Sequence, residues 1–206
     1  TEEHLRESGI SLSSDQVSQL GRHMEAVLRA NRELNLTRIM EPTEFMRLHI
    51  LDSLLVLQEV NGAPAGRIAD IGAGAGFPGI PLAISTGRRT ILIESVGKKA
   101  AFLKTVATEL DVISGVSVYS GRSWVFALEF PDSCAVVVAR AVAPLPCLVE
   151  LATPLLESGG MLIAMKGKID SDELEAGNAA AGLCGLSLTS DRRYHLPACG
   201  DDRSAI

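Results

Sequence analysis

The chain has 206 residues, 47% of them hydrophobic, which is enough to bury the core of one enzyme-sized domain with an extension. No stretch approaches 18 uninterrupted apolar residues, and the first residues (TEEH) lack the basic start and apolar segment of a signal peptide. We therefore expect a cytoplasmic protein with no membrane span. The formal net charge of -6 argues against binding nucleic acid through the overall field, although local basic clusters can still contact phosphates.

The four cysteines form no recognisable site. Cys134, Cys147, Cys184 and Cys199 are widely spaced, and no C-x-x-C pair occurs among them. Metal cages and disulfide frameworks both use closely patterned cysteines. We therefore expect reduced thiols and no bound metal. The Pro-Cys dipeptide at Cys147 also matches the nucleophile of carbon-5 cytosine methyltransferases, but a small core residue at a helix start is the simpler interpretation.

Two amphipathic helices are predicted in the first sixty residues. The SSDQ segment that begins at Ser13 has the form of a capping box, and apolar residues follow it at helical spacing as far as Leu28. Residues 35–38 (NLTR) break this pattern. Pro42 suits the first turn of a second helix that continues to Leu55.

A hinge is predicted at residues 61–66 (NGAPAG), where glycine, proline and asparagine replace the helical pattern. We therefore divide the chain into an N-terminal helical extension, residues 1–62, and a core domain, residues 63–206. The extension is expected to pack on the core, so that the two form one structural unit.

His49 and Asp52 share a face of the second predicted helix, because they stand three residues apart. A His-Asp pair suggests catalysis. With no nucleophile nearby, we favour a histidine whose ring is held by the carboxylate against the core domain.

An acid followed by closely spaced glycines stands at the centre of the chain, in residues 67–79 (RIADIGAGAGFPG). Glycine suits a backbone that must take positive φ or approach a ligand closely, so this turn is expected to hold something. Two fingerprints overlap there. The dinucleotide pattern G-x-G-x-x-G is matched by Gly74, Gly76 and Gly79. The acid-x-G-x-G-x-G turn of S-adenosylmethionine (SAM) methyltransferases is matched by Asp70, Gly72, Gly74 and Gly76.

The position of the first strand favours the SAM pattern. The dinucleotide glycines begin three residues after Ile71, whereas that pattern should follow its strand directly. In the SAM register, Asp70 is expected at the mouth of the turn, where it attracts the cationic amino-acid end of SAM and repels a pyrophosphate. A nicotinamide or flavin site, and a helix-capping turn without ligand, remain as alternatives.

Glu94 supports a nucleotide in either register. It ends a β-branched run, TILIE, at about the 20-residue offset at which an acid accepts hydrogen bonds from a ribose.

The core domain alternates apolar strands with helical segments. Beyond the runs that end at Ile71 and Glu94, strands are predicted at residues 116–119, 134–139, 161–165 and 186–189, with a helix at residues 98–110. Continuous apolar strands separated by helices indicate an α/β fold with a mostly parallel sheet covered on both faces.

Ligands of such sheets bind at the carboxyl ends of the strands. This rule selects loops that should surround one cleft: those at Asp70 and Gly72, at Glu94, at residues 121–124, at Arg140, and at Lys166. The last residues, RSAI, begin an apolar run in which a final strand is expected to be truncated or to continue beyond the sequence.

Several stretches together resemble one family: NLT at residues 35–37, HILDS at residues 49–53, the turn at residues 70–81, ESVGKK at residues 94–99, Arg140-Ala141 and Lys166-Gly167. They are similar to the bacterial 16S rRNA guanine-N7 methyltransferase G family, also called glucose-inhibited division protein B. The likeness runs from about Asn35 to Arg203. It implies a Rossmann-like SAM enzyme that methylates N7 of one guanine in the decoding-region loop of small-subunit rRNA.

The resemblance also implies cofactor contacts at matched positions, namely Gly72, Phe77, Ser123, Trp124 and Arg140. One departure stands out, because many members have Arg-Ala-Glu or Arg-Val-Glu where this chain has Arg122-Ser123-Trp124. If the family's acid holds the adenine edge, that contact must come here from the backbone or from packing of the indole.

The chemistry implied needs no general base, because guanine N7 carries a lone pair and no proton. The expected work of the protein is to align nitrogen, methyl carbon and sulfur and to exclude water. Arginine can present two donors to guanine O6 or to a phosphate, so Arg122, Arg140 and Lys166 are predicted to position the target nucleotide. An ordinary strand-end lysine is the alternative for Lys166. A target inside folded rRNA must be presented unstacked or flipped.

Three functions are therefore compared. The first is a SAM-dependent methyltransferase of 16S rRNA or the small ribosomal subunit, acting as a monomer without metal. The second is a SAM methyltransferase of a small metabolite, which suits the acidic charge balance. The third is a non-catalytic SAM-binding module of ribosome assembly.

Overall fold

The computed structural model describes residues 8–109, 115–196 and 202–206. The predicted helix end at Leu110 and the thiol of Cys199 lie outside the described residues. No helix in these ranges is both long and apolar enough to cross a membrane.

The first predicted helix is confirmed as α2 (Ser14–Leu34). Its capping box is complete, because the Gln16 amide donates to Ser13 Oγ and the Ser13 amide donates to Gln16 Oε1. The helix ends at Asn35, which takes a left-handed conformation.

The second predicted helix is interrupted by a wider turn. It begins with Pro42 in α3 (Pro42–Phe45), passes through the π-helix η1 (Met46–Leu51), and continues as α4 (Asp52–Leu54) and α5 (Leu57–Gly62). A π-turn inserts one residue into the helical repeat and often lies at a functional site.

Seven strands form one sheet in the order β3-β2-β1-β4-β5-β7-β6. The strands β1 (Ile68–Ile71), β2 (Thr90–Glu94), β3 (Val116–Ser120), β4 (Cys134–Arg140) and β5 (Leu156–Lys166) are parallel. At one edge, β7 (Asp202–Ala205) runs antiparallel to both β5 and β6 (Arg192–His195). The order reverses between β1 and β4, which is where ligands of doubly wound sheets bind. The predicted α/β class is confirmed.

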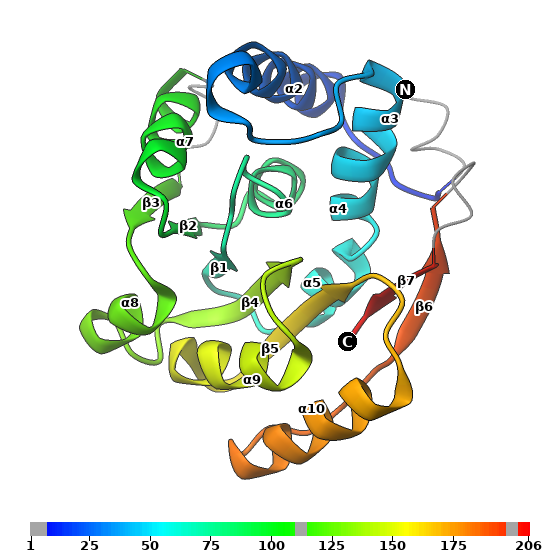
Figure 1. Ribbon diagram of the computed structural model, residues 1–206, viewed down its shortest axis with the longest axis vertical. Coiled ribbons are helices and arrows are strands. Elements are labelled where there is room, and N and C mark those ends of the chain that lie inside the picture. The colour runs from blue at the N-terminus through cyan, green and yellow to red at the C-terminus, as the bar shows by residue number, and fades with distance from the viewer. Residues whose placement is uncertain (1–7, 110–114, 197–201) are drawn as a thin grey trace.

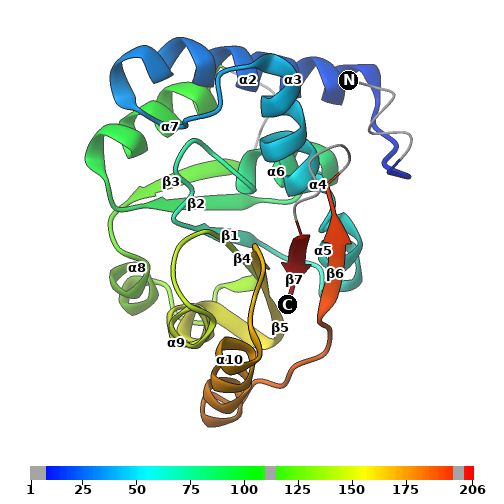
Figure 2. The same ribbon diagram turned by 45° about the vertical axis from the view of Figure 1, so that its right-hand side comes forward.

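Helices cover both faces of this sheet (Figure 1). One face carries α6 (Gly79–Thr86) and α7 (Gly97–Glu109), with α2 packed outside them. The other face carries α8 (Ser123–Glu129), α9 (Leu145–Ala152) and α10 (Ser171–Leu183), and a short 3-10 turn η2 (Thr153–Leu155) follows α9. Figure 2 shows the segment α3–α5 on the α6 side of the sheet, beside the hairpin β6–β7.

The N-terminal helices share a core with the sheet domain. Leu20 and Val27 of α2, Phe45 of α3, and Ile80 of α6 belong to one buried apolar cluster. The predicted extension therefore forms a packed layer on the sheet, which we call the N-terminal layer (residues 14–62).

Candidate active site

Three charged side chains near the carboxyl ends of neighbouring strands point to the same face of the sheet. Alternate residues of a strand face the same side. Asp70 shares its side with Ile68, Glu94 with Leu92, and Arg140 with Val138, and these three apolar residues pack against α6 and the N-terminal layer. The sheet therefore directs both acids and the arginine towards the layer formed by α6 and the N-terminal helices.

Asp70 lies beneath the glycine turn, so its expected position at the mouth of the turn is wrong. Its side chain is fully buried, and Oδ2 accepts a 2.8 Å hydrogen bond from the Gly79 amide at the start of α6. A Cβ on Gly79 would come within 2.7 Å of that oxygen. The reason is that Asp70 lies inside β1 on the same face as Ile68, so its side chain points to the helix rather than to the solvent.

Burial raises the pKa of Asp70 to about 7, a shift that the Gly79 amide and Arg140 oppose and Glu94 reinforces. Oδ1 of Asp70 is buried and has no hydrogen-bond partner among the described residues. Asp70 therefore supports the turn and the first turn of α6 at a cost in stability above neutral pH.

Glu94 ties the glycine turn to the end of β2. Its Oε2 accepts from the Gly74 amide at 2.9 Å, and its Oε1 accepts from the Val96 amide at 2.7 Å. Each carboxylate oxygen keeps a further lone pair. The position at the carboxyl end of β2 fits the predicted role of a ribose acceptor.

The glycine turn leaves an open, side-chain-free surface. Gly72, Gly74 and Gly76 take φ values of +70°, +57° and +97°, which side chains rarely adopt. A Cβ on Gly74 would approach no described atom closer than the Gly72 carbonyl oxygen, at 3.7 Å. At Gly72 it would collide with Val142, and at Gly76 with Ile80. Gly74 therefore lies at the open part of the turn, while its neighbours are also required for packing.

Two aromatic residues support the turn from below. The buried His23 contacts the Ala75 carbonyl oxygen through Nε2 at 2.8 Å, and burial lowers its pKa to about 4. Phe77 is buried between the rings of His23 and His49, at centroid distances of 4.6 and 4.9 Å. The Phe77 side chain thus belongs to the support of the turn. Sequence reasoning missed His23 as a support of the turn, although its position between Leu20 and Val27 on the apolar face of α2 could have indicated that it is buried.

Exposed apolar side chains follow the neighbouring strands. Val96, after β2, is 41% exposed, and Trp124, at the start of α8, is 56% exposed. Ser123 is buried beside Trp124, and Arg122 is the exposed residue before α8. Apolar surface at this edge suits the flat ring of a nucleoside.

Arg140 is held by the N-terminal layer. Its Nη1 donates to Asp52 Oδ2 at 2.8 Å and to the Leu48 carbonyl oxygen at 3.0 Å, and its Nη2 lies 3.2 Å from His49 Nδ1. The guanidinium carbon also lies 5.6 Å from the centroid of Phe77. The carboxylate that was expected to hold the His49 ring therefore binds Arg140 instead.

His49 is a neutral acceptor in this arrangement. Guanidinium only donates, so Nδ1 accepts from Arg140, and Nε2 carries the proton towards Thr37 Oγ1, 2.8 Å away. Burial, and then the charges of Arg140 and His23, lower the pKa of His49 to about 3. Its ring holds Arg140 and Phe77 in place and is not poised as a base.

A cavity of about 370 Å³ opens beside Arg140 at the carboxyl ends of β4 and β5. We call it the Arg140 cavity. Polar side chains from five parts of the chain line it: His49, Asp52, Arg140, Lys166, Tyr194 and Arg203. Tyr194 donates to Asp52 Oδ1 at 3.2 Å, and Arg203 Nε lies 3.8 Å from the same oxygen. Sequence reasoning missed both residues as members of the site, because only the pairing of β6 with β7 brings them there.

Lys166 borders the Arg140 cavity, but its ammonium group is bonded elsewhere. Nζ donates to the Ala143 carbonyl oxygen at 2.9 Å and pairs with Glu173 Oε1 at 2.7 Å. Lys166 alternates with Met165 along β5, so its side chain leaves the strand on the face covered by α10. Arg122, Arg140 and Lys166 thus all lie at the carboxyl ends of parallel strands, as predicted, but the Lys166 ammonium group is paired with Glu173 of α10.

No group of three or more histidine, cysteine or acidic side chains within the described ranges is placed to hold a metal ion.

The family model of rRNA small subunit methyltransferase G matches residues 16–200. The chain belongs to this family. It is 37% identical to ribosomal RNA small subunit methyltransferase G of Myxococcus xanthus, over 96% of this chain and 90% of that protein. It is 36% identical to the protein of the same name from Desulfitobacterium hafniense, over 96% of this chain and 82% of the relative.

Solved structures show the same fold at lower identity. The M. jannaschii TYW2 in complex with AdoMet has a TM-score of 0.57 at 15% identity, over 74% of this chain and 73% of that one. A precorrin-6y C5,15-methyltransferase from Geobacter metallireducens has a TM-score of 0.58 at 13% identity, over 74% and 84%. The predicted Rossmann-like methyltransferase sheet is confirmed.

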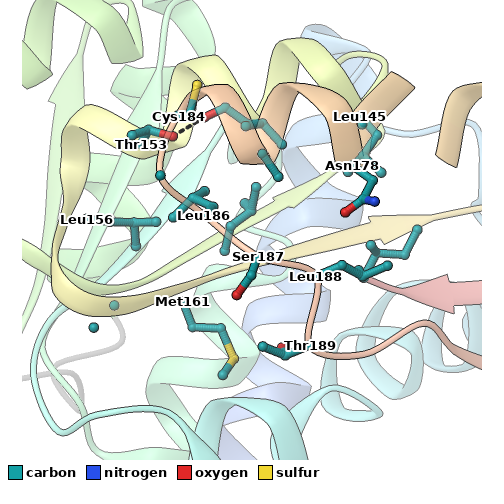
Figure 3. A pocket seen from close by; sticks show the side chains of 18 of the residues that line it. Leu145, Thr153, Leu156, Met161, Asn178, Cys184, Leu186, Ser187, Leu188 and Thr189 are labelled. Carbon is teal, nitrogen blue, oxygen red and sulfur yellow. Dashed lines mark hydrogen bonds between the residues drawn. The ribbon is translucent and has the colours of Figure 1, made fainter. Parts of the chain in front are cut away.

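This member of the methyltransferase G family has a second and larger cavity, of about 790 Å³, which is lined by none of the residues of the glycine turn or of the Arg140 cavity. Figure 3 shows it between α9, α10, β5 and the segment from Cys184 to Thr189. The predicted strand at residues 186–189 is wrong, because this segment is irregular and lines the cavity. Leu186 is partly buried against the core of the sheet, whereas Leu188 is 43% exposed. None of the predicted site residues borders this cavity as described.

Proposed function

We propose that this protein transfers the methyl group of SAM to N7 of a guanine in the decoding-region loop of 16S rRNA. Membership of the methyltransferase G family carries the rRNA substrate. We assign the site to the carboxyl ends of the strands because a side-chain-free turn and the charged Arg140 cavity lie together there.

The residues at the turn fit SAM. Gly72, Gly74 and Gly76 form a cradle that a Cβ on Gly74 would fill, and Glu94 has carboxylate lone pairs to accept from ribose hydroxyls. Asp70, whose pKa is raised to about 7, is only partly ionised at neutral pH, and it contributes by holding the Gly79 amide beneath the turn. Bound SAM supplies an electrophilic methyl group on a sulfonium centre.

The adenine end of the cofactor is assigned to the loops after β2 and β3. Val96 and Trp124 offer exposed apolar surface there, and Ser123 lies beside the indole. Trp124 stands where many family members have an acid, so the indole replaces a hydrogen-bonding edge with a packing surface. Phe77 contributes to cofactor binding indirectly, because its packing on His23 and His49 keeps the turn rigid.

The target guanine is assigned to the Arg140 cavity. N7 attack requires no proton removal, and the neutral His49 is already bonded to Arg140 and Thr37. Arg140 on its wall and Arg122 at the same carboxyl ends position the nucleotide and exclude water. Lys166 borders the cavity and takes part in positioning only when its ammonium group leaves Glu173. Methylation leaves a cationic purine, so these positively charged side chains orient the nucleotide and do not stabilise the positive charge that develops on the base.

RNA contact is assigned to the same edge of the molecule. Arg122, Lys98 and Lys168 are exposed and follow the carboxyl ends of β3, β2 and β5. Local cations around the cleft allow phosphate binding by a chain with a net charge of -6. A 16S rRNA substrate places the protein in the cytoplasm.

Labelled SAM tests this proposal directly. The protein is incubated with bare 16S rRNA, with small subunits from cells that lack this methylation, and with a metabolite extract. Label recovered from the RNA as 7-methylguanine is expected. Label that appears only in small molecules, or at another base position, would overturn the proposal. A protein that binds SAM in calorimetry but labels nothing would favour a binding module.

A further inference from the structure

We propose that Asp52 is a positioning residue for methyl transfer and that Tyr194 acts through it, because together they fix the guanidinium of Arg140 beside the cavity. The inference rests on the proposed function and deepens it. It gives a role in the reaction to the N-terminal layer, which contains Asp52, and to strand β6, which contains Tyr194, although both lie outside the glycine turn.

The contact between Asp52 and Arg140 is short and buried. The two side chains are 3% and 16% exposed, and Nη1 lies 2.8 Å from Oδ2. A buried ion pair is stable only when its remaining donors and acceptors are also satisfied. Here the Leu48 carbonyl oxygen takes a second bond from Nη1, and His49 accepts from Nη2. Both ends of the guanidinium are thus fixed.

The π-helix provides this set of acceptors. In a regular α-helix the Asp52 amide would donate to the Leu48 carbonyl. Here the Asp52 amide donates to the carbonyls of Arg47 and His49 instead, and Leu48 accepts from Arg140. The wider turn therefore presents a backbone oxygen, an imidazole nitrogen and a carboxylate to a single guanidinium.

Tyr194 engages the other carboxylate oxygen. Its hydroxyl donates to Asp52 Oδ1 at 3.2 Å from strand β6, across 142 residues of sequence. Burial and the Asp52 charge raise the pKa of Tyr194, so the hydroxyl stays protonated and donating over the whole physiological range. Asp52 is consequently held from two sides, with Arg140 on one oxygen, and with the Tyr194 hydroxyl and the more distant Arg203 guanidinium, at 3.8 Å, on the other.

The consequence for the reaction is geometric. Arg140, Asp52 and Tyr194 all line the Arg140 cavity, so a shift of the carboxylate moves the guanidinium that forms its wall. Displacements of about 1 Å in a positioning group can cost about a hundredfold in rate. Loss of the Tyr194 hydroxyl removes one neutral donor, for which a rate loss of about fivefold is expected.

Tyr194→Phe tests the inference, with Tyr119→Phe as the matched control. Tyr119 is the only other tyrosine in the sequence, and its hydroxyl donates to Glu129 at 2.7 Å, away from Arg140. Single-turnover methyl transfer to small-subunit RNA, the SAM dissociation constant and the melting temperature are measured for each. We expect Tyr194→Phe to slow transfer about fivefold with unchanged SAM affinity, and Tyr119→Phe to leave transfer unchanged.

A double-mutant cycle separates positioning from mere stability. In an Arg140→Lys background, Tyr194→Phe is expected to have no further effect on transfer, because its route through Arg140 is gone. An undiminished effect in that background, or equal rates for the two tyrosine variants, would overturn this inference alone. A wild-type protein that transfers no label to RNA would overturn the proposed function and this inference with it.

Discussion

The two halves of the site are built in different ways. On the cofactor side, the turn at residues 72–79 presents backbone and glycine, and a single carboxylate, Glu94, joins it to the next strand. On the target side, the Arg140 cavity is lined by charged side chains from distant parts of the chain that bind one another. The first half depends on the absence of side chains, and the second on their mutual positions.

This difference predicts how each half fails. A glycine turn is disabled by adding one carbon, whereas a network of charged groups loses function by degrees as single bonds are removed. The Tyr194 and Arg140 variants above weaken the target side and are measured by methyl transfer. The variants below act on the cofactor side and on the RNA contact, and they are measured by stability, SAM affinity and RNA affinity.

Asp70→Asn carries the largest expected effect, on stability. The folded pKa of about 7 lies above the ordinary 3.8, so the protonated acid stabilises the fold below pH 4, and this contribution is lost as pH rises to 7. Asparagine does not titrate, so the free energy of unfolding of the variant, relative to that of the wild type, should rise by an amount on the order of 3 kcal/mol from pH 4 to pH 8. Urea unfolding at both pH values measures the difference. A pH-independent difference would contradict the burial of a titrating acid beneath the turn.

Gly74→Ala should disable the cofactor side. The added methyl group enters the open cradle at φ +57°, and SAM affinity should fall roughly tenfold to a hundredfold, as for overpacking by one methyl group. Gly87→Ala is the matched control, because Gly87 has φ +67° and no described atom within 4 Å of an added Cβ, but lies at the far end of α6. Calorimetry should show a loss only for Gly74→Ala. Equal losses would mean that backbone strain, and not the cradle, is responsible.

Glu94→Gln should weaken SAM binding more modestly. A neutral amide keeps one acceptor oxygen but loses the charge-assisted bonds, which corresponds to about a tenfold loss of affinity. Glu173→Gln changes the same group on the ion pair with Lys166 and should leave SAM affinity unchanged. An unaltered dissociation constant for Glu94→Gln would remove the ribose role from this residue.

Lys168→Ala should have the smallest effect, and on RNA alone. One exposed cation after β5 accounts for about one phosphate contact, so RNA affinity should fall a few-fold and the salt dependence by about one unit of slope. Lys104→Ala, midway along α7, is the control and should bind RNA as the wild type does. Equal slopes for all three proteins would move the RNA contact away from this edge.

The cofactor side could be predicted from the sequence because its information is local. The strand, the glycines and Glu94 lie within 27 residues, and their spacing fixes the turn and the next strand end. The error at Asp70 came from strand alternation, because Asp70 shares its face of β1 with Ile68 and its carboxylate therefore lies under α6.

The target side could be predicted only in part. Arg140 and Lys166 were placed at the edge by the rule of carboxyl strand ends, and His49 and Asp52 by helical spacing. Their partners were not readable, because the bonds from Asp52 span 88 and 142 residues of sequence. The π-turn also has no sequence pattern of its own, so the binding of Arg140 in place of a His-Asp pair could not be foreseen.

A crystal structure with SAM and a target-loop RNA oligonucleotide tests the central claim most directly. The account predicts adenosine between Val96 and Trp124, ribose on Glu94, and the methyl group directed from the glycine turn into the Arg140 cavity, where a guanine presents N7. An empty turn with SAM in the larger cavity beside α10, or a guanine bound away from Arg140, would contradict it.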